Sequence, residues 1–246
     1  MQGRFAKGML FVQMNCADPA HDDDFNRWYN EVHVPDVIAT GWVENGRRYR
    51  NLAADLREGE SRYLALYETD RWDMEDMIDS FRTVDGPRWR EQGHTTTYSQ
   101  LVRMSVVRRC GPPFRPESSG FTTARTGTAP VSGLLLMLDI CTEPAQEGNF
   151  NDWFNRHAIP ELIATGPFHT AYRFACAVRE PDGSRLFATL CETEAADPRA
   201  EVARFLEQWQ PSSARPAFAQ HQSTSVFAPI FAQVAEPAEE VAARVS

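Results

Sequence analysis

His33 is the residue of this 246-residue chain whose type and spacing best suit proton transfer. It follows Trp28 by five residues and Tyr29 by four, on the edge of an apolar stripe with helical spacing. A half-desolvated histidine beside a pocket can exchange protons at neutral pH, and such acid-base catalysis contributes roughly 10²- to 10⁴-fold to a rate. The structural alternative is a histidine that is hydrogen-bonded to a nearby carbonyl group where Pro35 disturbs the helix.

Other side chains could assist His33 from neighbouring elements. His94 is the second acid-base candidate, and its structural alternative is a surface histidine in the turn at Gly93. Tyr67 and Tyr49 stand in expected strands and could donate a phenolic hydrogen bond to a developing oxyanion. Their alternative is packing across strands. His33, His94 and Tyr67 are therefore the candidate catalytic residues.

Arg48 is the candidate anion-binding residue. It recurs in the second half of the chain as Arg173, just as Glu68 recurs as Glu192, so a structural Arg–Glu pair is the simplest interpretation. The alternative is that Arg48 binds a carboxylate or an enolate. The side chains expected to contact a substrate are Trp28, Tyr29, Trp42, Arg48 and Tyr49.

These candidates lie in the first of two copies of a repeated sequence. Shifted by 125 residues, positions 9–49 align with 134–174 without a gap and share 14 identical residues. The segment between the copies is dense in Gly, Pro, Ser and Thr, as linkers are. We therefore predict an N-terminal unit at 1–108 with the working site, a linker at 109–131, a C-terminal unit at 132–235 and a tail at 236–246.

Each copy predicts the element order strand–helix–strand–strand–helix–strand. In the first copy the expected elements are strand Met9–Met14, a helix starting at 22–24 and stopped by Gly41, strands Trp42–Asn51 and Arg62–Thr69, helix Asp73–Phe81 and strand Thr95–Val107. This order is the split βαβ, or ferredoxin-like, pattern. The predicted fold is α+β, with two tandem ferredoxin-like (βαββαβ) units packed sheet to sheet.

The segment Trp28-Tyr29-Asn30-Glu31-Val32-His33-Val34-Pro35, followed by Gly41 and Arg48, resembles the dimeric α/β-barrel superfamily, and within it the EthD-like branch with its W-Y-x-x-x-H-x-P segment. The resemblance implies that the two units form an intrachain barrel and that ligands sit between a sheet and its helices. It also implies a role for His33. The superfamily includes cofactor-free lyases, cyclases and decarboxylases, monooxygenases and haem-binding enzymes, so membership does not choose the reaction.

The second copy departs from this pattern. In Trp153-Phe154-Asn155-Arg156-His157-Ala158-Ile159-Pro160 the histidine stands one residue early, which is about 100° of helix rotation. Ala158 takes the position of His33 and Phe154 that of Tyr29. We therefore expect one working site, in the N-terminal copy, and a degenerate site in the C-terminal copy.

Composition and missing motifs exclude several classes of function. With 25 Lys and Arg against 34 Asp and Glu the net charge is −9, which disfavours nucleic-acid binding. The longest aliphatic run, Leu134–Leu138, is too short to cross a membrane, so we expect no membrane partner and a cytoplasmic location. Phosphate-binding loops, hydrolase elbows and zinc-protease motifs are absent. The acidic run at 22–24 is typical of a helix start, so no metal site is expected.

Together these patterns predict a cofactor-independent lyase that acts on a small aromatic or polyketide-like molecule by histidine acid-base catalysis. The reaction would be an elimination, a C–C cleavage, a decarboxylation or a cyclisation. A monooxygenase, either haem-dependent or cofactor-free, is the alternative on the same fold, because one exposed histidine in an apolar cleft can ligate iron. A non-catalytic binding protein is the third hypothesis. Both a monomeric intrachain barrel and a homodimer are compatible with the duplication.

Overall fold

The computed structural model describes residues 4–112, 114 and 131–235, and in them eight strands form one closed antiparallel barrel. The strand order around the barrel is β1-β3-β2-β8-β5-β7-β6-β4. The strands are β1 Gly8–Cys16, β2 Asn45–Asn51, β3 Tyr63–Thr69, β4 Ser99–Arg109, β5 Gly133–Cys141, β6 Thr170–Cys176, β7 Arg185–Thr193 and β8 Ala219–Val234. The last strand of each half pairs with the second strand of the other, β8 with β2 and β4 with β6, which closes the barrel.

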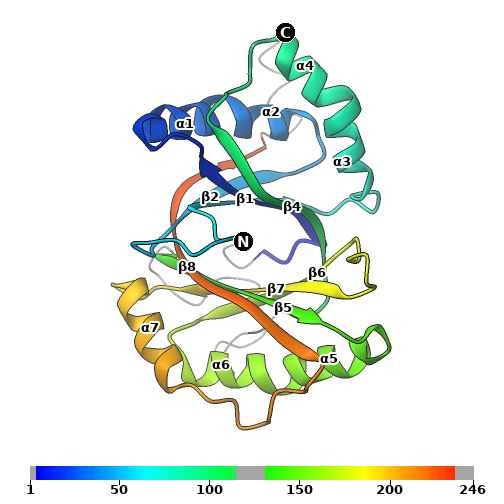
Figure 1. The fold of residues 1–246 in the computed structure, drawn as a ribbon, viewed down its shortest axis with the longest axis vertical. Helices are drawn as coiled ribbons and strands as arrows, with labels where there is room; N and C mark the ends of the chain where they lie inside the picture. The colour runs from blue at the N-terminus through cyan, green and yellow to red at the C-terminus, as the bar shows by residue number, and fades with distance from the viewer. Residues whose placement is uncertain (1–3, 113, 115–130, 236–246) are drawn as a thin grey trace.

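The helices lie in two layers outside the barrel, α1 to α4 on one side and α5 to α7 on the other (Figure 1). The first layer contains α1 Asp22–Trp28, a π-helical turn Tyr29–His33, α2 Val34–Ala39, α3 Asp76–Ser80, a second π-helical turn Phe81–Asp85 and α4 Gly86–Glu91. The second contains α5 Glu147–Trp153, a π-helical turn Phe154–Ala158, α6 Ile159–Thr165 and α7 Pro198–Gln208. Short 3₁₀ helices at Pro19–His21 and Pro144–Gln146 precede α1 and α5. The mixed α+β class is confirmed, whereas the proposed linker and tail fall largely outside the described residues.

The π-helical turn that carries Tyr29 and His33 has a local cause. Pro35 has no N–H group and stands in the first turn of α2, so the regular hydrogen-bond ladder is interrupted there. The N–H group of Val34 instead donates to the carbonyl oxygen of Tyr29, five residues back. Such turns are frequent at functional sites, because they re-aim side chains.

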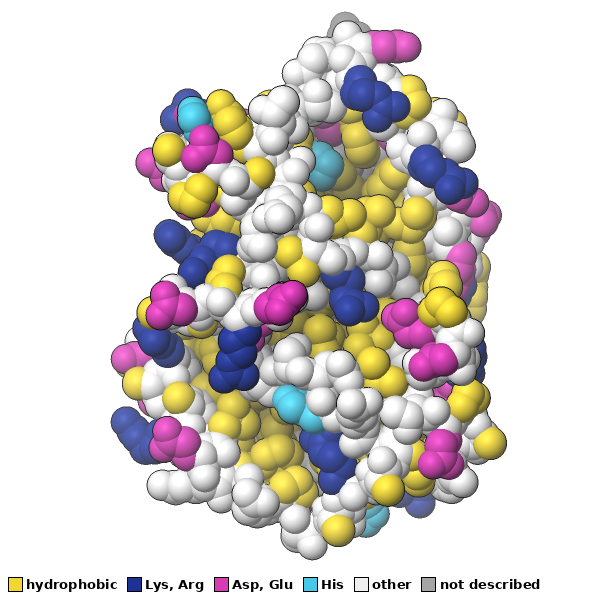
Figure 2. Space-filling model, in the orientation of Figure 1, with side chains coloured by type: hydrophobic (Ala, Val, Ile, Leu, Met, Phe, Trp, Pro, Cys, Tyr) yellow, Lys and Arg dark blue, Asp and Glu magenta, His cyan; other side chains and the backbone are white. Residues whose placement is uncertain are grey.

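Side chains of the strands alternate between the barrel interior and the helix layers. The interior core joins both halves, with Leu64 and Leu66 of β3 packed in one cluster with Leu134 and Leu136 of β5. A separate apolar cluster lies under each helix layer. Hydrophobic side chains are also visible in hollows of both halves on the face drawn in Figure 2. This alternation decides which candidate residues can meet, because only helix-facing positions reach His33.

The structural Arg48–Glu68 pair expected from the repeat is wrong. Arg48 faces the helices, whereas Glu68 faces the barrel interior, where its carboxylate accepts a hydrogen bond from Asn45 at 2.9 Å. The two positions differ in strand parity: Arg48 lies opposite Ala65, and Glu68 lies three residues further along the same strand. Identity in a repeat showed that both residues matter to the fold, but it did not show that they touch.

Gly46 sets the distance between β2 and α2. A Cβ atom at Gly46 would lie 2.7 Å from Cγ1 of Val34 and 3.0 Å from the ring of Tyr67. We expect Gly46→Ala to lower the free energy of unfolding by about 1–3 kcal/mol in urea denaturation, through overpacking. Gly148→Ala is the matched control: no atom lies within 4 Å of its Cβ position in α5, so a helix-favouring residue should stabilise by up to about 1 kcal/mol. Equal effects of the two changes would contradict the prediction.

Candidate functional site

His33 lies in a cage of aromatic rings under the first helix layer. Its imidazole stacks on Trp28 with ring centroids 5.0 Å apart. The rings of Tyr29 and Trp89 are in T-shaped contact with it, and their centroids lie 4.8 and 5.7 Å from that of the imidazole. Neither ring nitrogen of this partly buried side chain makes a hydrogen bond within the described part of the chain. Burial, followed by the charge of Arg48, lowers the pKa of His33 to about 4, so the imidazole is neutral at pH 7.

Two tyrosine hydroxyl groups face each other beside this histidine. The hydroxyl groups of Tyr29 and Tyr67 are buried and lack a hydrogen-bond partner of normal geometry, although they lie close enough to shift each other's pKa. Burial raises the pKa of both phenols, so both keep their protons at neutral pH. Buried polar groups without partners are rare in native proteins, and one recognised reason is a water or ligand that completes them.

Arg48 brings a buried positive charge to the same cluster. Its guanidinium centre lies 4.0 Å from the ring centroid of Tyr29, and it donates to the side-chain oxygens of Asn30 at 2.6 Å and Asn26 at 2.9 Å. Burial lowers the pKa of Arg48, while the nearby tyrosines act in the opposite direction. The Arg48 side chain is fully buried, yet no carboxylate in the described residues forms an ion pair with it. It is therefore a buried positive charge whose hydrogen-bond partners in the described residues are neutral asparagine oxygens.

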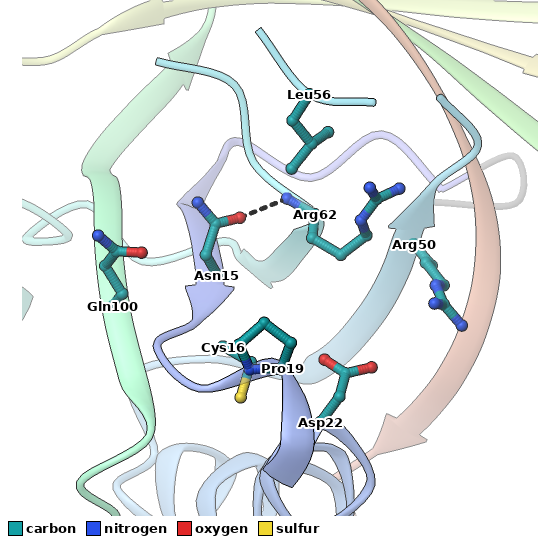
Figure 3. Close-up of a pocket in the computed structure, with 8 residues that line it drawn as sticks. All are labelled: Asn15, Cys16, Pro19, Asp22, Arg50, Leu56, Arg62 and Gln100. Atoms are coloured by element: carbon teal, nitrogen blue, oxygen red, sulfur yellow. Dashed lines mark hydrogen bonds between the residues drawn. The ribbon is translucent and has the colours of Figure 1, made fainter. Parts of the chain in front are cut away.

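A hydrogen-bond chain connects Arg48 with a surface pocket. Asn26 donates to the hydroxyl of Tyr63 at 2.8 Å, and that hydroxyl donates to the carboxylate of Asp22 at 2.6 Å. Asp22 lines a pocket of about 450 Å³ together with Arg50 and other residues at the ends of β1, β2 and β4 (Figure 3). Asp22 stands in the first turn of α1, as the acidic run at 22–24 predicted, and its carboxylate also accepts the hydrogen bond from Tyr63.

The second half keeps the arginine and loses the hydroxyl groups. Arg173 donates to Asn151 at 3.0 Å and Asn155 at 2.9 Å, as Arg48 does to Asn26 and Asn30. The rings nearest to Arg173 belong to Phe150, Phe154 and Phe187. In the repeat alignment Phe154, Phe187 and Cys191 replace Tyr29, Tyr63 and Tyr67, and Ala158 replaces His33. His157 is exposed and does not occupy the place of His33.

The structure brings together Trp28, Tyr29, His33, Arg48 and Tyr67 from the predicted site, and it separates the others. The His94 ring pairs with Asp36 at 2.9 Å; the residue stands in the turn after α4 rather than at the start of β4, although its carbonyl group accepts a hydrogen bond from Trp28. The ring of Trp42 lies 4.5 Å from the guanidinium of Arg71.

Tyr49 is also separated from the site. Its side chain packs in the barrel-interior cluster and lines a second cavity of about 210 Å³ with Arg47. Because Arg48 faces the helices, its neighbour Tyr49 must face the opposite side of the strand.

Four residues of the cluster were missed by the sequence analysis: Asn26, Asn30, Tyr63 and Trp89. The two asparagines carried a usable signal, because both are identical in the repeat alongside Arg48. Trp89 carried none, because it lies in α4, beyond the expected end of the second helix.

A haem bound at His33 would have to displace the aromatic rings that pack against its imidazole. The ring of Trp28 stacks on the imidazole, and the rings of Tyr29 and Trp89 stand at steep angles to it. Neither of the two cavities described above is lined by a histidine. Within the described ranges, no three His, Cys, Asp or Glu side chains gather as a metal site. No helix among the described residues combines the length and apolar character needed to cross a bilayer.

Comparisons with known proteins support the fold and leave the activity open. Residues 9–105 match the model of a family described as a domain of unknown function, DUF4286. A search of curated proteins finds no match. Among solved structures, an anthrone oxidase-like protein is similar over 96% of this chain and 97% of its own, with 9% identity and a TM-score of 0.59.

Two further solved structures are also similar. A variant of DypB from Rhodococcus jostii RHA1 in complex with heme gives a TM-score of 0.52 at 10% identity, covering 92% of this chain and 94% of its own. A dye-decolorizing peroxidase from Bacteroides thetaiotaomicron VPI-5482 gives 0.53 at 8% identity, with coverage of 92% and 93%. The likeness extends along nearly all of each chain, so it concerns the whole barrel with both helix layers.

Proposed function

We propose that the N-terminal half binds a small aromatic or polyketide-like molecule and that His33 removes a proton from it. The observation that carries this proposal is the neutral, partly exposed imidazole of His33 beside a buried guanidinium and the buried hydroxyl groups of Tyr29 and Tyr67, which face each other and have no hydrogen-bond partner of normal geometry. A neutral imidazole accepts a proton at pH 7, and the aromatic rings of Trp28 and Trp89 offer flat apolar contacts to an aromatic substrate.

In this proposal the remaining residues stabilise the anion that proton removal creates. The protonated hydroxyl groups of Tyr29 and Tyr67 donate hydrogen bonds to the developing oxyanion, and the charge of Arg48 lies behind the ring of Tyr29. The substrate oxygen then satisfies both orphaned hydroxyl groups. His33 and Tyr67 are the catalytic residues in this scheme, while His94, paired with Asp36, holds the end of α4 against α2.

The fate of the anion distinguishes two reaction classes. Elimination, C–C cleavage, decarboxylation or cyclisation would make the protein a cofactor-independent lyase. Attack of the anion on O₂ would make it a cofactor-free monooxygenase, and the whole-chain structural likeness to an anthrone oxidase-like protein favours testing this class. Both readings fit two tandem ferredoxin-like units of the EthD-like type, one with and one without the hydroxyl-lined site.

Anthrone is a suitable probe because its central methylene group is acidic and its anion reacts with O₂. We expect the protein to accelerate deuterium exchange at this carbon in anaerobic D₂O, measured by NMR. In air, consumption of one O₂ for each anthraquinone and each water formed would assign the monooxygenase class. Exchange without oxygen uptake would favour lyase chemistry. Anthrone that binds but neither exchanges nor reacts would overturn the proposal and leave a binding protein.

A further inference from the structure

Three side chains of the C-terminal half form a hydrogen-bonded line that the proposed function does not use. Nδ1 of His221 lies 3.0 Å from Oδ1 of Asp139, and Nε2 of the same ring lies 3.0 Å from Oγ1 of Thr224. The Asp139 carboxylate accepts a hydrogen bond from Nδ1 of His221, so Nδ1 carries the proton. The lone pair of Nε2 then points at the hydroxyl group of Thr224. An acid, an imidazole and a hydroxyl joined in this order are the arrangement that activates a nucleophile.

A β-bulge makes this arrangement possible. Leu138 pairs with Ser223, but the next residue, Asp139, pairs with His221, so Gln222 is an extra residue in β8. In a regular strand, positions 221 and 224 would face opposite sides of the sheet. The extra residue puts His221 and Thr224 on the same face of the sheet, where they pair with helix-facing residues of β5.

The N-terminal half contains the same bulge without the polar residues. Gln13 pairs with Arg103, whereas Met14 pairs with Leu101, so the irregularity lies at the equivalent point of β1 and β4. The positions that match Asp139, His221 and Thr224 are therefore Met14, Leu101 and Met104. The bulge belongs to the fold, but the acid, the imidazole and the hydroxyl occur in one half only.

The line of residues is anchored at one end and open at the other. Asp139 is 2% exposed and also accepts a hydrogen bond from Arg215 at 2.6 Å, which supplies a countercharge for the buried carboxylate. The His221 side chain is 39% exposed, and Thr224 is partly exposed. The anchored acid holds the ring in place, while a substrate can approach the hydroxyl group.

We propose that Asp139, His221 and Thr224 form a second active site, which transfers small acyl groups from esters or thioesters. The Oγ1 atom of Thr224 forms a bond to the acyl carbon, and its proton passes to Nε2 of His221. The bond from carbon to the alcohol or thiol breaks, and the leaving group takes the proton from His221. Water, deprotonated by the same imidazole, then attacks the acyl carbon. The bond from this carbon to Oγ1 of Thr224 breaks, Oγ1 takes the proton from His221, and the carboxylic acid is released.

Acetylation by 4-nitrophenyl acetate tests this proposal directly. Brief incubation of the full-length protein should release 4-nitrophenolate and place one acetyl group on the peptide that contains Thr224, identified by mass spectrometry. Thr224→Val removes the hydroxyl group with little change of shape and should lower the rate of acetylation at this peptide at least about tenfold, as should His221→Gln. Thr224→Ser keeps a hydroxyl group at this position and should retain the rate of acetylation.

Two controls separate a catalytic from a structural role. Ser223→Ala removes a hydroxyl group from the adjacent position, which pairs with an interior-facing residue, and should leave the rate unchanged. His33→Gln should also leave it unchanged, so failure of the N-terminal site and failure of this one remain distinguishable. Acetyl groups found only on lysine or cysteine residues, or an unchanged rate in folded Thr224→Val, would overturn the proposal.

Discussion

Replacing His33 with glutamine is expected to lower turnover at the N-terminal site at least about a hundredfold. Glutamine retains polarity and approximate size but cannot accept the substrate proton as a base. Because His33 makes no hydrogen bond in the described residues, the change removes no internal partner, and circular dichroism should show the same fold. His157→Gln is the matched control, since His157 is exposed in the equivalent turn of the other half, and it should retain full activity.

The pH dependence gives a signature that a structural role would not produce. The pKa of His33 is lowered to about 4, so the active, neutral form predominates above this pH and is lost only as the pH falls through about 4. The log of kcat/KM should therefore be flat from about pH 5 to 8 and fall on the acid side with a midpoint near 4. A midpoint near the ordinary histidine value of 6.5, or undiminished activity of His33→Gln, would argue against this base.

The strands and their order were predictable because each obeys a local rule. Apolar stretches such as Met9–Met14 and Leu134–Ile140 have strand length, and the structure extends them only to Gly8–Cys16 and Gly133–Cys141. The sequence similarity between the two halves then supports each predicted element a second time. The helix at Asp73–Phe81 was placed too short, since a π-helical turn and Pro87 allow it to continue as α4 to Glu91.

The candidate site was predictable only where residues share one element. Trp28, Tyr29 and His33 stand in one helical segment, so their spacing shows that they are neighbours. Residues on different strands depend on register and parity, which the chain does not reveal locally. Tyr49 faces the barrel interior for that reason, although it is adjacent to Arg48.

The grouping of Asp139, His221 and Thr224 was even harder to predict from the sequence, because it depends on a β-bulge. His221 and Thr224 are three residues apart, a spacing that predicts opposite faces in a strand. Only the extra residue at Gln222, seen in the pairing with β5, brings them together. In the sequence Asp139 is a polar residue that ends an aliphatic run. Its contact with His221 spans 82 positions of the chain, so no local pattern predicts it.

Removal of Arg48 should produce the largest loss of stability. Arg48→Ala leaves a cavity at one of the largest fully buried side chains and strands the amide oxygens of Asn26 and Asn30. Relief from burying a cation acts in the opposite direction, but the cavity and the orphaned acceptors outweigh it. We expect the free energy of unfolding to fall by about 3–5 kcal/mol in guanidinium denaturation. Arg48→Met refills the volume and should cost about 1–3 kcal/mol.

Comparison with other arginines separates the two roles of Arg48. Arg50→Ala, two residues further along the strand, removes an exposed side chain without an ion pair in the described residues and should change stability by less than about 0.5 kcal/mol. Arg173→Ala should cost as much stability as Arg48→Ala, because Asn151 and Asn155 hold it in the same way. A loss below about 1 kcal/mol in both alanine variants would refute the structural role.

Since only Arg48 lies beside Tyr29 and His33, folded Arg48→Met should lose activity at the N-terminal site whereas folded Arg173→Met should keep it. With these outcomes, Arg48 and Arg173 would share a structural role, and Arg48 alone would have the second role proposed for the N-terminal site.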